Sequence, residues 1–252
     1  MTLAFRTLVR RELGGYFLSS TGYLVMATVL VLLGMSFWGI LEDLNVEELT
    51  DAPITEQFFV SYYFWMILLL TTPIITMRLF AQEKSMGTYE TLLTAPVRDL
   101  EVVLAKFTAA LLFYLVTWLP LAIHLGIVRR YSNDPAVLSV ATLLTTLLGV
   151  SLVGSVFLAL GCLASALTRS QPVAAMLSYG FCVGLFLLGL RNVYGSSSSG
   201  FGTRLFEYVS LTDHLERFAR GIVDTRPVVF YLSLTAFVLF LTHQAVRSQR
   251  WR

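Results

Sequence analysis

Lysine is nearly absent from this sequence, and its scarcity excludes one class of function. Lys84 and Lys106 are the only lysines, and neither follows a glycine. A P-loop needs the pattern Gly-x-x-x-x-Gly-Lys-Ser/Thr to hold nucleotide phosphates. The chain therefore does not hydrolyse ATP through a P-loop, and any ATP-driven work would need a separate hydrolysing subunit.

Charged side chains of both signs are also scarce. They make up 13% of the 252 residues, while hydrophobic residues make up 56%. In soluble domains about a quarter of the residues are charged. The formal net charge is only +2, so the sequence has no basic field of the kind that attracts nucleic acid. This composition predicts an integral membrane protein that does not bind nucleic acid.

Residues that bind metals or form disulfides are few. Cys162 and Cys182 each lie within a long apolar run and are predicted to be core residues. His124, His214 and His243 lie far apart, without an HExxH pairing. We therefore expect no metal, cofactor or catalytic centre in this chain.

One enzyme class stays open as a remote alternative. An intramembrane serine hydrolase could use Ser151 or Ser155 as the nucleophile, with His124 or His243 as the base. No nucleophile motif surrounds either serine, so this alternative has little support.

Six apolar runs are long enough to cross a membrane, which takes about 20 helical residues. No charged side chain occurs in the runs themselves, which are residues 16–41, 57–77, 107–128, 135–168, 170–190 and 227–246. This absence argues against a proton-coupled carrier. The fourth run is too short for two crossings and a turn, and we expect one long or tilted helix there. The predicted spans are residues 18–41, 58–80, 102–128, 137–167, 171–191 and 227–247.

The distribution of charge predicts the orientation of these spans. The side that holds the N-terminus has eleven basic and five acidic residues, and the other side has seven basic and eleven acidic residues. Because cytoplasmic loops are enriched in arginine and lysine, both termini are predicted to be cytoplasmic. The acidic stretch at residues 42–57, on the outer side, has the composition of a solvated loop.

Residues 1–17 predict a basic amphipathic helix in the inner membrane interface. Gly14 and Gly15 are expected to turn the chain into the first span. Arg6, Arg10 and Arg11 point away from the apolar face of this helix. That face consists of Phe5, Leu8, Val9, Leu13 and Tyr16.

A charged island at residues 78–106 separates the second span from the third. The preceding helix is expected to continue to about Met86 and to end at Gly87, in the left-handed position. Thr88 is a plausible N-cap for a second, short helix, which Pro96 would end. Taken on spacing alone, a solvated loop is the alternative, but two capped helices indicate a docking segment at residues 81–99.

The string Ala81-x-Glu83-x-x-x-Gly87-Thr88-x-Glu90-x-Leu92-x-x-x-Pro96 resembles the cytoplasmic coupling segment of ABC-2 type permeases. The resemblance is closest to the short six-span branch associated with gliding motility and with maturation of copper enzymes. It implies an ATP-binding cassette subunit as partner, with ATP and Mg held in that partner. The residues that it implies for coupling are Glu83, Gly87, Thr88, Glu90, Leu92 and Pro96.

Residues 203–222 predict an outer amphipathic helix before the last span. Leu211, Leu215 and Phe218 share its apolar face with Ile222, and Gly221 suits its C-terminal end. Two i,i+4 ion pairs are expected on the polar face, from Asp213 to Arg217 and from Glu216 to Arg220. By the same resemblance Leu211, Leu215 and Phe218 are candidates for an outer gate, although a linker helix on the membrane surface explains the pattern equally well.

Small residues at helical spacing suggest sites of close helix contact. Gly180-x-x-x-Gly184 lies in the fifth span, and further small residues recur in the fourth span. The contact could lie within one subunit or across a dimer, and the partner could be an identical or a similar permease.

The sequence thus predicts an all-α membrane protein with a single ABC-2 transmembrane domain over residues 1–252, like the type V exporters. The implied function is the permease subunit of an exporter in the bacterial inner membrane. The alternative is a subunit that transmits force to a periplasmic partner without moving a solute, as the likeness to gliding-motility permeases would allow.

Overall fold

The computed structural model describes residues 3–45, 54–89, 97–131, 139–194 and 210–249, and these ranges contain helices without any strand. Six helical segments in them have the length and hydropathy of membrane spans. The chain is therefore a multi-pass membrane protein, and the all-α fold predicted from the sequence is confirmed. The six segments are Ser20–Glu42, Tyr62–Ser85, Asp99–Arg130, Val140–Leu167, Gln171–Gly189 and Thr225–Gln249.

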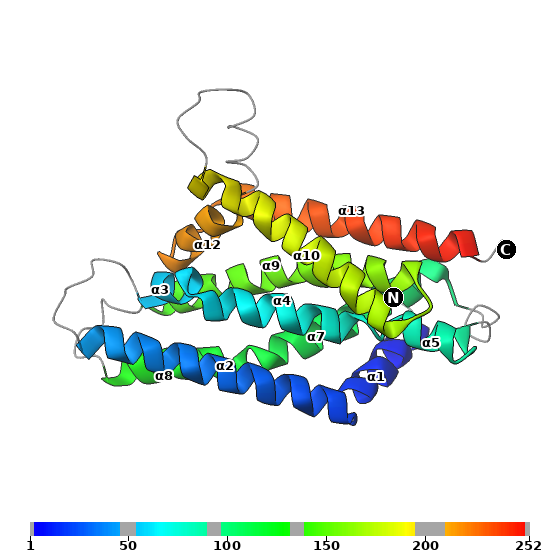
Figure 1. Ribbon diagram of the computed structural model, residues 1–252, viewed down its shortest axis with the longest axis horizontal. Helices are drawn as coiled ribbons and strands as arrows, with labels where there is room; N and C mark the ends of the chain where they lie inside the picture. The colour runs from blue at the N-terminus through cyan, green and yellow to red at the C-terminus, as the bar shows by residue number, and fades with distance from the viewer. Residues whose placement is uncertain (1–2, 46–53, 90–96, 132–138, 195–209, 250–252) are drawn as a thin grey trace, which may run out of the picture.

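The long helices lie side by side in a bundle, with the shorter helices at its two ends (Figure 1). The helices are α1 (Leu3–Phe17), α2 (Ser20–Asn45), α3 (Ile54–Val60), α4 (Tyr62–Thr76), α5 (Ala81–Ser85), α7 (Asp99–Thr117), α8 (Leu119–Tyr131), α9 (Val140–Leu167), α10 (Gln171–Tyr194), α12 (Leu211–Ala219) and α13 (Thr225–Gln249).

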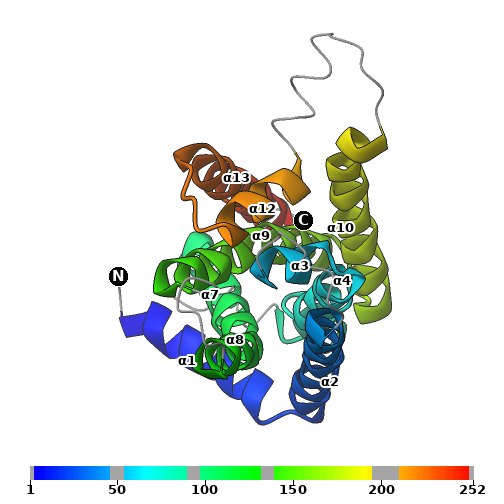
Figure 2. The same cartoon turned by 90° about the vertical axis from the view of Figure 1, so that its left-hand side faces the viewer.

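Helix α9 is the centre of the bundle. It packs against α4, α7, α10, α12 and α13, and Figure 2 shows it surrounded by them when the bundle is viewed from one end. The fourth apolar run thus forms one continuous helix, as predicted. Small residues make this packing close. A Cβ added at Gly154 would lie 2.2 Å from the Tyr114 ring, and one at Gly161 would lie 2.1 Å from the Thr76 hydroxyl.

The second and third spans are each interrupted once. The second run begins as α3, breaks at Ser61, whose hydroxyl accepts a hydrogen bond from the Tyr63 amide, and resumes as α4. The predicted helix beyond α4 is also broken, because residues 77–80 form a turn before α5. The third span breaks at Trp118, just before Pro120, whereas Pro73 lies inside α4 without a break.

The N-terminal segment forms the predicted amphipathic helix, but it packs differently from the expectation. Gly14 and Gly15 stay inside α1, and the chain turns into α2 only after Phe17. The apolar face contacts α7, which covers it in part. Tyr16 is buried and stacks on Phe113 at a centroid distance of 4.8 Å, whereas the rest of the face, Phe5, Leu8, Val9 and Leu13, is half-buried.

The two ends of the bundle carry different short elements. One end, here named the α5 end, holds α1, α5 and the C-terminal end of α13, whereas the α12 end holds α3, α12 and the adjoining ends of α2 and α8 (Figure 1). The first described helix, α1, and the end of the last, α13, thus lie toward the α5 end, in agreement with an even number of spans.

Candidate functional site

The charged island begins with a sharp corner between α4 and α5, fixed by one serine of α9. The Ser165 hydroxyl accepts hydrogen bonds from the backbone amides of Phe80 (3.0 Å) and Ala81 (3.1 Å) and donates one to the Met77 carbonyl (3.2 Å). These are groups that a broken helix leaves without intrahelical partners. The island is therefore attached to the central helix of the bundle at its first turn.

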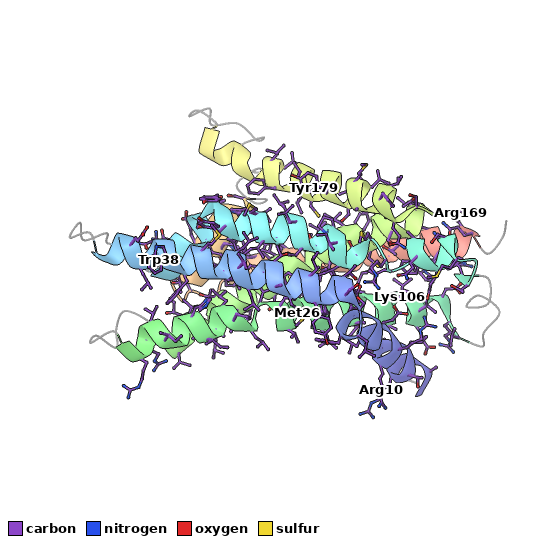
Figure 3. All side chains as sticks on the ribbon, turned by 60° about the horizontal axis from the view of Figure 1, so that its bottom comes forward. Arg10, Met26, Trp38, Lys106, Arg169 and Tyr179 are labelled. Atoms are coloured by element: carbon purple, nitrogen blue, oxygen red, sulfur yellow. The ribbon has the colours of Figure 1, made fainter. Side chains whose placement is uncertain are left out.

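Four charged side chains from three helices meet behind this corner, and we name them the charge cluster: Arg11 and Glu12 of α1, Glu83 of α5, and Lys106 of α7. The Lys106 ammonium lies 3.1 Å from Glu12 and 3.0 Å from Glu83, and the Arg11 guanidinium lies 2.7 Å from Glu12 and 2.8 Å from Glu83. Lys106 is only 2% exposed. Figure 3 shows Lys106 within the bundle, whereas Arg10 of α1 points away from it.

The electrostatics of the cluster favour the ionised form of Glu12. Burial acts to raise the pKa of the Glu12 carboxyl, but the nearby charges of Lys106 and Arg11 and their hydrogen bonds outweigh burial, so this pKa lies below its usual value. The hydrogen bond to Glu12 likewise raises the pKa of Arg11. Two positive and two negative charges compensate one another, as partly buried charges require.

Two further contacts hold the island against its neighbours. Arg78 donates to the Ser19 hydroxyl (2.9 Å), in the turn between α1 and α2, and to Gln82 (3.2 Å). On the other side, Lys84 donates to the Ala166 carbonyl, at the end of α9, and also lies over the Tyr89 ring. The island is thus connected to α1, α2, α7 and α9 at once.

The predicted coupling residues can be located only in part. Glu83 lies in the charge cluster, and Gly87 has φ +71°, which confirms the predicted left-handed end of the helix. The Thr88 hydroxyl donates to the Glu83 carbonyl at 3.3 Å. Glu90, Leu92 and Pro96 lie outside the described residues.

At the α12 end, the three gate candidates are buried within the subunit. Leu211, Leu215 and Phe218 are each at most 1% exposed, and Phe218 packs against Gly149 of α9. Ile222, predicted on the same face, is exposed because the helix ends before it, with Gly221 at φ +79°. The helix thus docks on the bundle, and its apolar face does not point into the lipid.

The ion pairs on α12 differ from the predicted i,i+4 pairs. Arg217 pairs with Asp224 (3.0 Å), and Arg220 forms a two-point pair with Glu56 of α3, at 2.9 Å for both contacts. Glu56 had been assigned to a solvated acidic loop, and that assignment is wrong for this residue. Thr55 reinforces the contact by donating to the Ala219 carbonyl (2.6 Å).

Gly180 and Gly184 do not mediate helix packing within the described part of the subunit. A Cβ added at either glycine would meet nothing within 4 Å. Of the two alternatives left open by the sequence, contact inside the subunit is therefore not observed among the described residues.

The structure also separates the serines and histidines of the hydrolase alternative. Ser151 and Ser155 donate to backbone carbonyls of their own helix, and Ser155 also contacts Thr235. His124 stacks on Phe37 instead, at a centroid distance of 4.7 Å. No serine–histidine hydrogen bond occurs in the ranges that the structure describes, so this arrangement does not support a hydrolase.

Sequence reasoning missed three members of the charge cluster. Arg11 had been placed on the polar side of the N-terminal helix, and Glu12 and Lys106 had only been counted as charges in the orientation argument. One signal was available: a lysine flanked by long apolar sequence at the start of a span, in a chain with two lysines, calls for a buried carboxylate partner. The identity of that partner depends on how α1 crosses α7, which local patterns do not encode.

The comparisons with known proteins agree with this architecture. A comparison with curated proteins gives no significant match. The family model described as "ABC-2 family transporter protein" matches residues 39–247, which include four complete spans, nearly all of the last span, the charged island and α12. The match covers most of the sequence, and the chain therefore belongs to the ABC-2 transporter family.

Proposed function

We propose that this chain is the permease subunit of an ATP-binding cassette exporter. ATP would be hydrolysed by a separate cassette subunit that docks on the charged island, and the permease would use the resulting movement to pass a solute across the membrane. Family membership supports a membrane transport component in general. The coupling, the export direction and the partner are the proposal.

The charge cluster is the observation that carries this proposal. A docking segment can transmit movement only if it is attached to the helices that must move. Glu83, one residue of the segment, is bound to α7 through Lys106 and to α1 through Arg11. With Ser165 attaching the same corner to α9, a push on the segment would displace several helices together.

The proposed orientation places the α5 end in the cytoplasm. The exposed arginines of α1, Arg6 and Arg10, lie at this end, as the positive-inside rule requires. The membrane would then be the bacterial inner membrane, and α12 would face the periplasm, where a further partner could bind.

We also propose that two permease subunits assemble, either identical or similar. Six spans are few for a transport pathway. The bare surface at Gly180 and Gly184 on α10 would allow a second subunit to approach closely.

The test is the ATPase activity of the purified complex with substitutions in the segment. The left-handed φ of Gly87 disfavours a side chain by about 1 kcal/mol, so Gly87→Ala should shift the segment without unfolding the bundle. We expect the permease to stop stimulating the cassette in this variant, while the complex still assembles. Gly126→Ala, at an exposed helical site with nothing within 4 Å, is the matched control. Normal stimulation in Gly87→Ala and in Glu90→Ala would contradict the proposal.

A further inference from the structure

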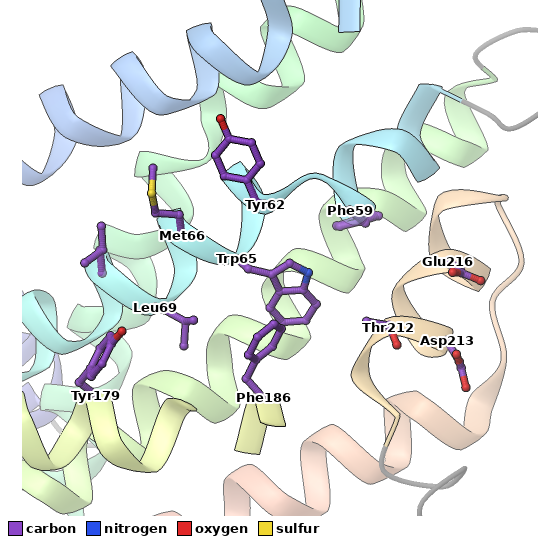
Figure 4. A pocket seen from close by; sticks show the side chains of 11 residues that line it. Phe59, Tyr62, Trp65, Met66, Leu69, Tyr179, Phe186, Thr212, Asp213 and Glu216 are labelled. Atoms are coloured by element: carbon purple, nitrogen blue, oxygen red, sulfur yellow. The ribbon is translucent and has the colours of Figure 1, made fainter. Parts of the chain in front are cut away.

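A groove of about 740 Å³ runs between α4, α10 and α12 and is not needed for any part of the coupling described above. This volume is in the range of small-molecule sites, about 300 to 1,000 Å³. Figure 4 shows aromatic side chains from α3, α4 and α10 along it, with α12 at one end. Trp65 and Phe186 form its floor, with ring centroids 4.5 Å apart.

The charged side chains that line the groove lie at the end formed by α12. Thr212, Asp213 and Glu216 line it there, and all three are half-buried. Along α4 the lining extends from Tyr62 to Leu70, about 12 Å at 1.5 Å per residue. The groove therefore has the two-part form of an amphiphile site, with a long apolar section and a short charged end.

The two carboxylates at this end do not form the i,i+4 ion pairs that the sequence pattern predicts. Arg217 is bound to Asp224, and Arg220 is bound to Glu56. Among the described residues, neither Asp213 nor Glu216 takes part in an ion pair. Burial raises the pKa of Glu216, and the nearby charges of Glu56 and Asp213 act in the same direction, while the nearby charge of Arg220 acts to lower it.

A ligand that fits this site must complement both parts. A cationic head group would compensate the carboxylates, and an alkyl chain would bury the aromatic surface. Aromatic faces also attract quaternary ammonium groups directly. An anionic amphiphile of the same length would meet the same apolar walls but an unfavourable charge.

We propose that the groove binds cationic amphiphiles, with the head group at Asp213 and Glu216 and the chain along α4 and α10. If the bound amphiphile is also the cargo, the proposal rests on the proposed export function. The binding itself does not depend on that function, because this chain alone carries all the residues that line the groove.

The test is photolabelling of the purified chain in nanodiscs of neutral lipid, without ATP or a cassette. The probe is an alkyltrimethylammonium ion with a diazirine at the end of its chain, and labelled peptides are mapped by mass spectrometry. We expect labelling of residues 59–70 and 179–186, which dodecyltrimethylammonium prevents and dodecyl sulfate does not. Labelling elsewhere, or equal competition by both amphiphiles, would overturn the proposal. This test uses only the wild-type protein, so its outcome does not depend on whether a variant folds.

Variants then test the head-group assignment. The double variant Asp213→Asn, Glu216→Gln should bind the probe about tenfold more weakly, the loss expected for two solvent-accessible ion pairs. The charge-preserving double variant Asp213→Glu, Glu216→Asp should restore binding. Glu42→Gln, which removes an exposed carboxylate from α2 outside the groove, should bind as the wild type does. Equal binding by the neutral double variant and the wild type would overturn the head-group assignment. This result would leave the proposed docking of a cassette subunit untouched, because the experiment contains no cassette.

Discussion

Lys106 places a positive charge between two carboxylates that come from different helices. Its ammonium contacts Glu12 of α1 and Glu83 of α5 at about equal distances, 3.1 and 3.0 Å. Without this charge the two carboxylates would face one another in a largely buried space, with Arg11 as the remaining cation. Lys106 is therefore the one member of the cluster that connects both carboxylates to α7.

We predict that Lys106→Met lowers the free energy of unfolding by about 3 kcal/mol, because it leaves buried charges uncompensated. Unfolding of the purified protein by heat or by a denaturing detergent measures this loss. Arg10→Met, at an exposed position of α1, is the control and should change stability little. A Lys106→Met protein as stable as the control would show that the cluster does not hold the helices together.

Glu12 gives the cluster a predictable dependence on pH. Its pKa is lowered in the folded protein, so its ionised form stabilises the fold above the unfolded pKa of about 4.3. This contribution is lost as the pH falls through the folded value. We expect wild type to be more stable than Glu12→Gln at pH 7, with a difference that shrinks below about pH 4. Thermal unfolding of both proteins over this range checks it, and a difference that is constant with pH would be the contrary result.

At the scale of elements, α9 is positioned by contacts that tolerate no added volume. Gly154 faces the fully buried Tyr114, whose hydroxyl donates to the Val150 carbonyl at 3.2 Å. Gly154→Ala should therefore destabilise the protein by about 2 kcal/mol through overpacking. Gly126→Ala makes the same change where there is room and should cost nothing. Similar unfolding temperatures for the two variants would contradict this account of the packing.

Helix α12 is attached to the bundle by polar contacts on one side and apolar contacts on the other. Arg220 binds Glu56 of α3, and Thr145 of α9 donates to the Phe218 carbonyl at 2.7 Å. We predict that Glu56→Gln speeds hydrogen exchange of the α12 backbone, because the two-point pair is lost. Asp224→Asn, which removes the more exposed pair with Arg217, should have a smaller effect. The reverse order would show that the contact with α3 does not hold α12.

The elements were predictable from sequence to different degrees. The spans follow from long apolar runs. The ends of α5 and α12 follow from Gly87 and Gly221, because a left-handed backbone favours glycine. The breaks at Ser61 and after Thr76 were not predictable, since neither is marked by proline or glycine. The Ser61 hydroxyl caps a new helix, and Ser165, far along the chain, satisfies the backbone at the second break. Ion-pair partners on α12 were misassigned because tertiary contacts replaced the local i,i+4 choices.

For the whole molecule, the structure places two differently equipped ends on one helical bundle. The α5 end has the charged island attached to α1, α7 and α9, and the α12 end has a groove with an acidic rim. Helix α9 contacts elements at both ends, so movement at one end can reach the other through a continuous helix. This arrangement suits a protein that uses a soluble partner on one side to act on a solute held near the opposite side.

The most direct test of the central claim is affinity purification of the tagged chain from its own membranes, followed by mass spectrometry. The account predicts that an ATP-binding cassette protein co-purifies and that it is lost when residues 87–96 are replaced by a glycine–serine linker of the same length. A replacement of equal length at residues 195–204 is the control and should retain the partner. Recovery of the folded chain without a cassette protein, or retention of the cassette after replacement of residues 87–96, would contradict the account.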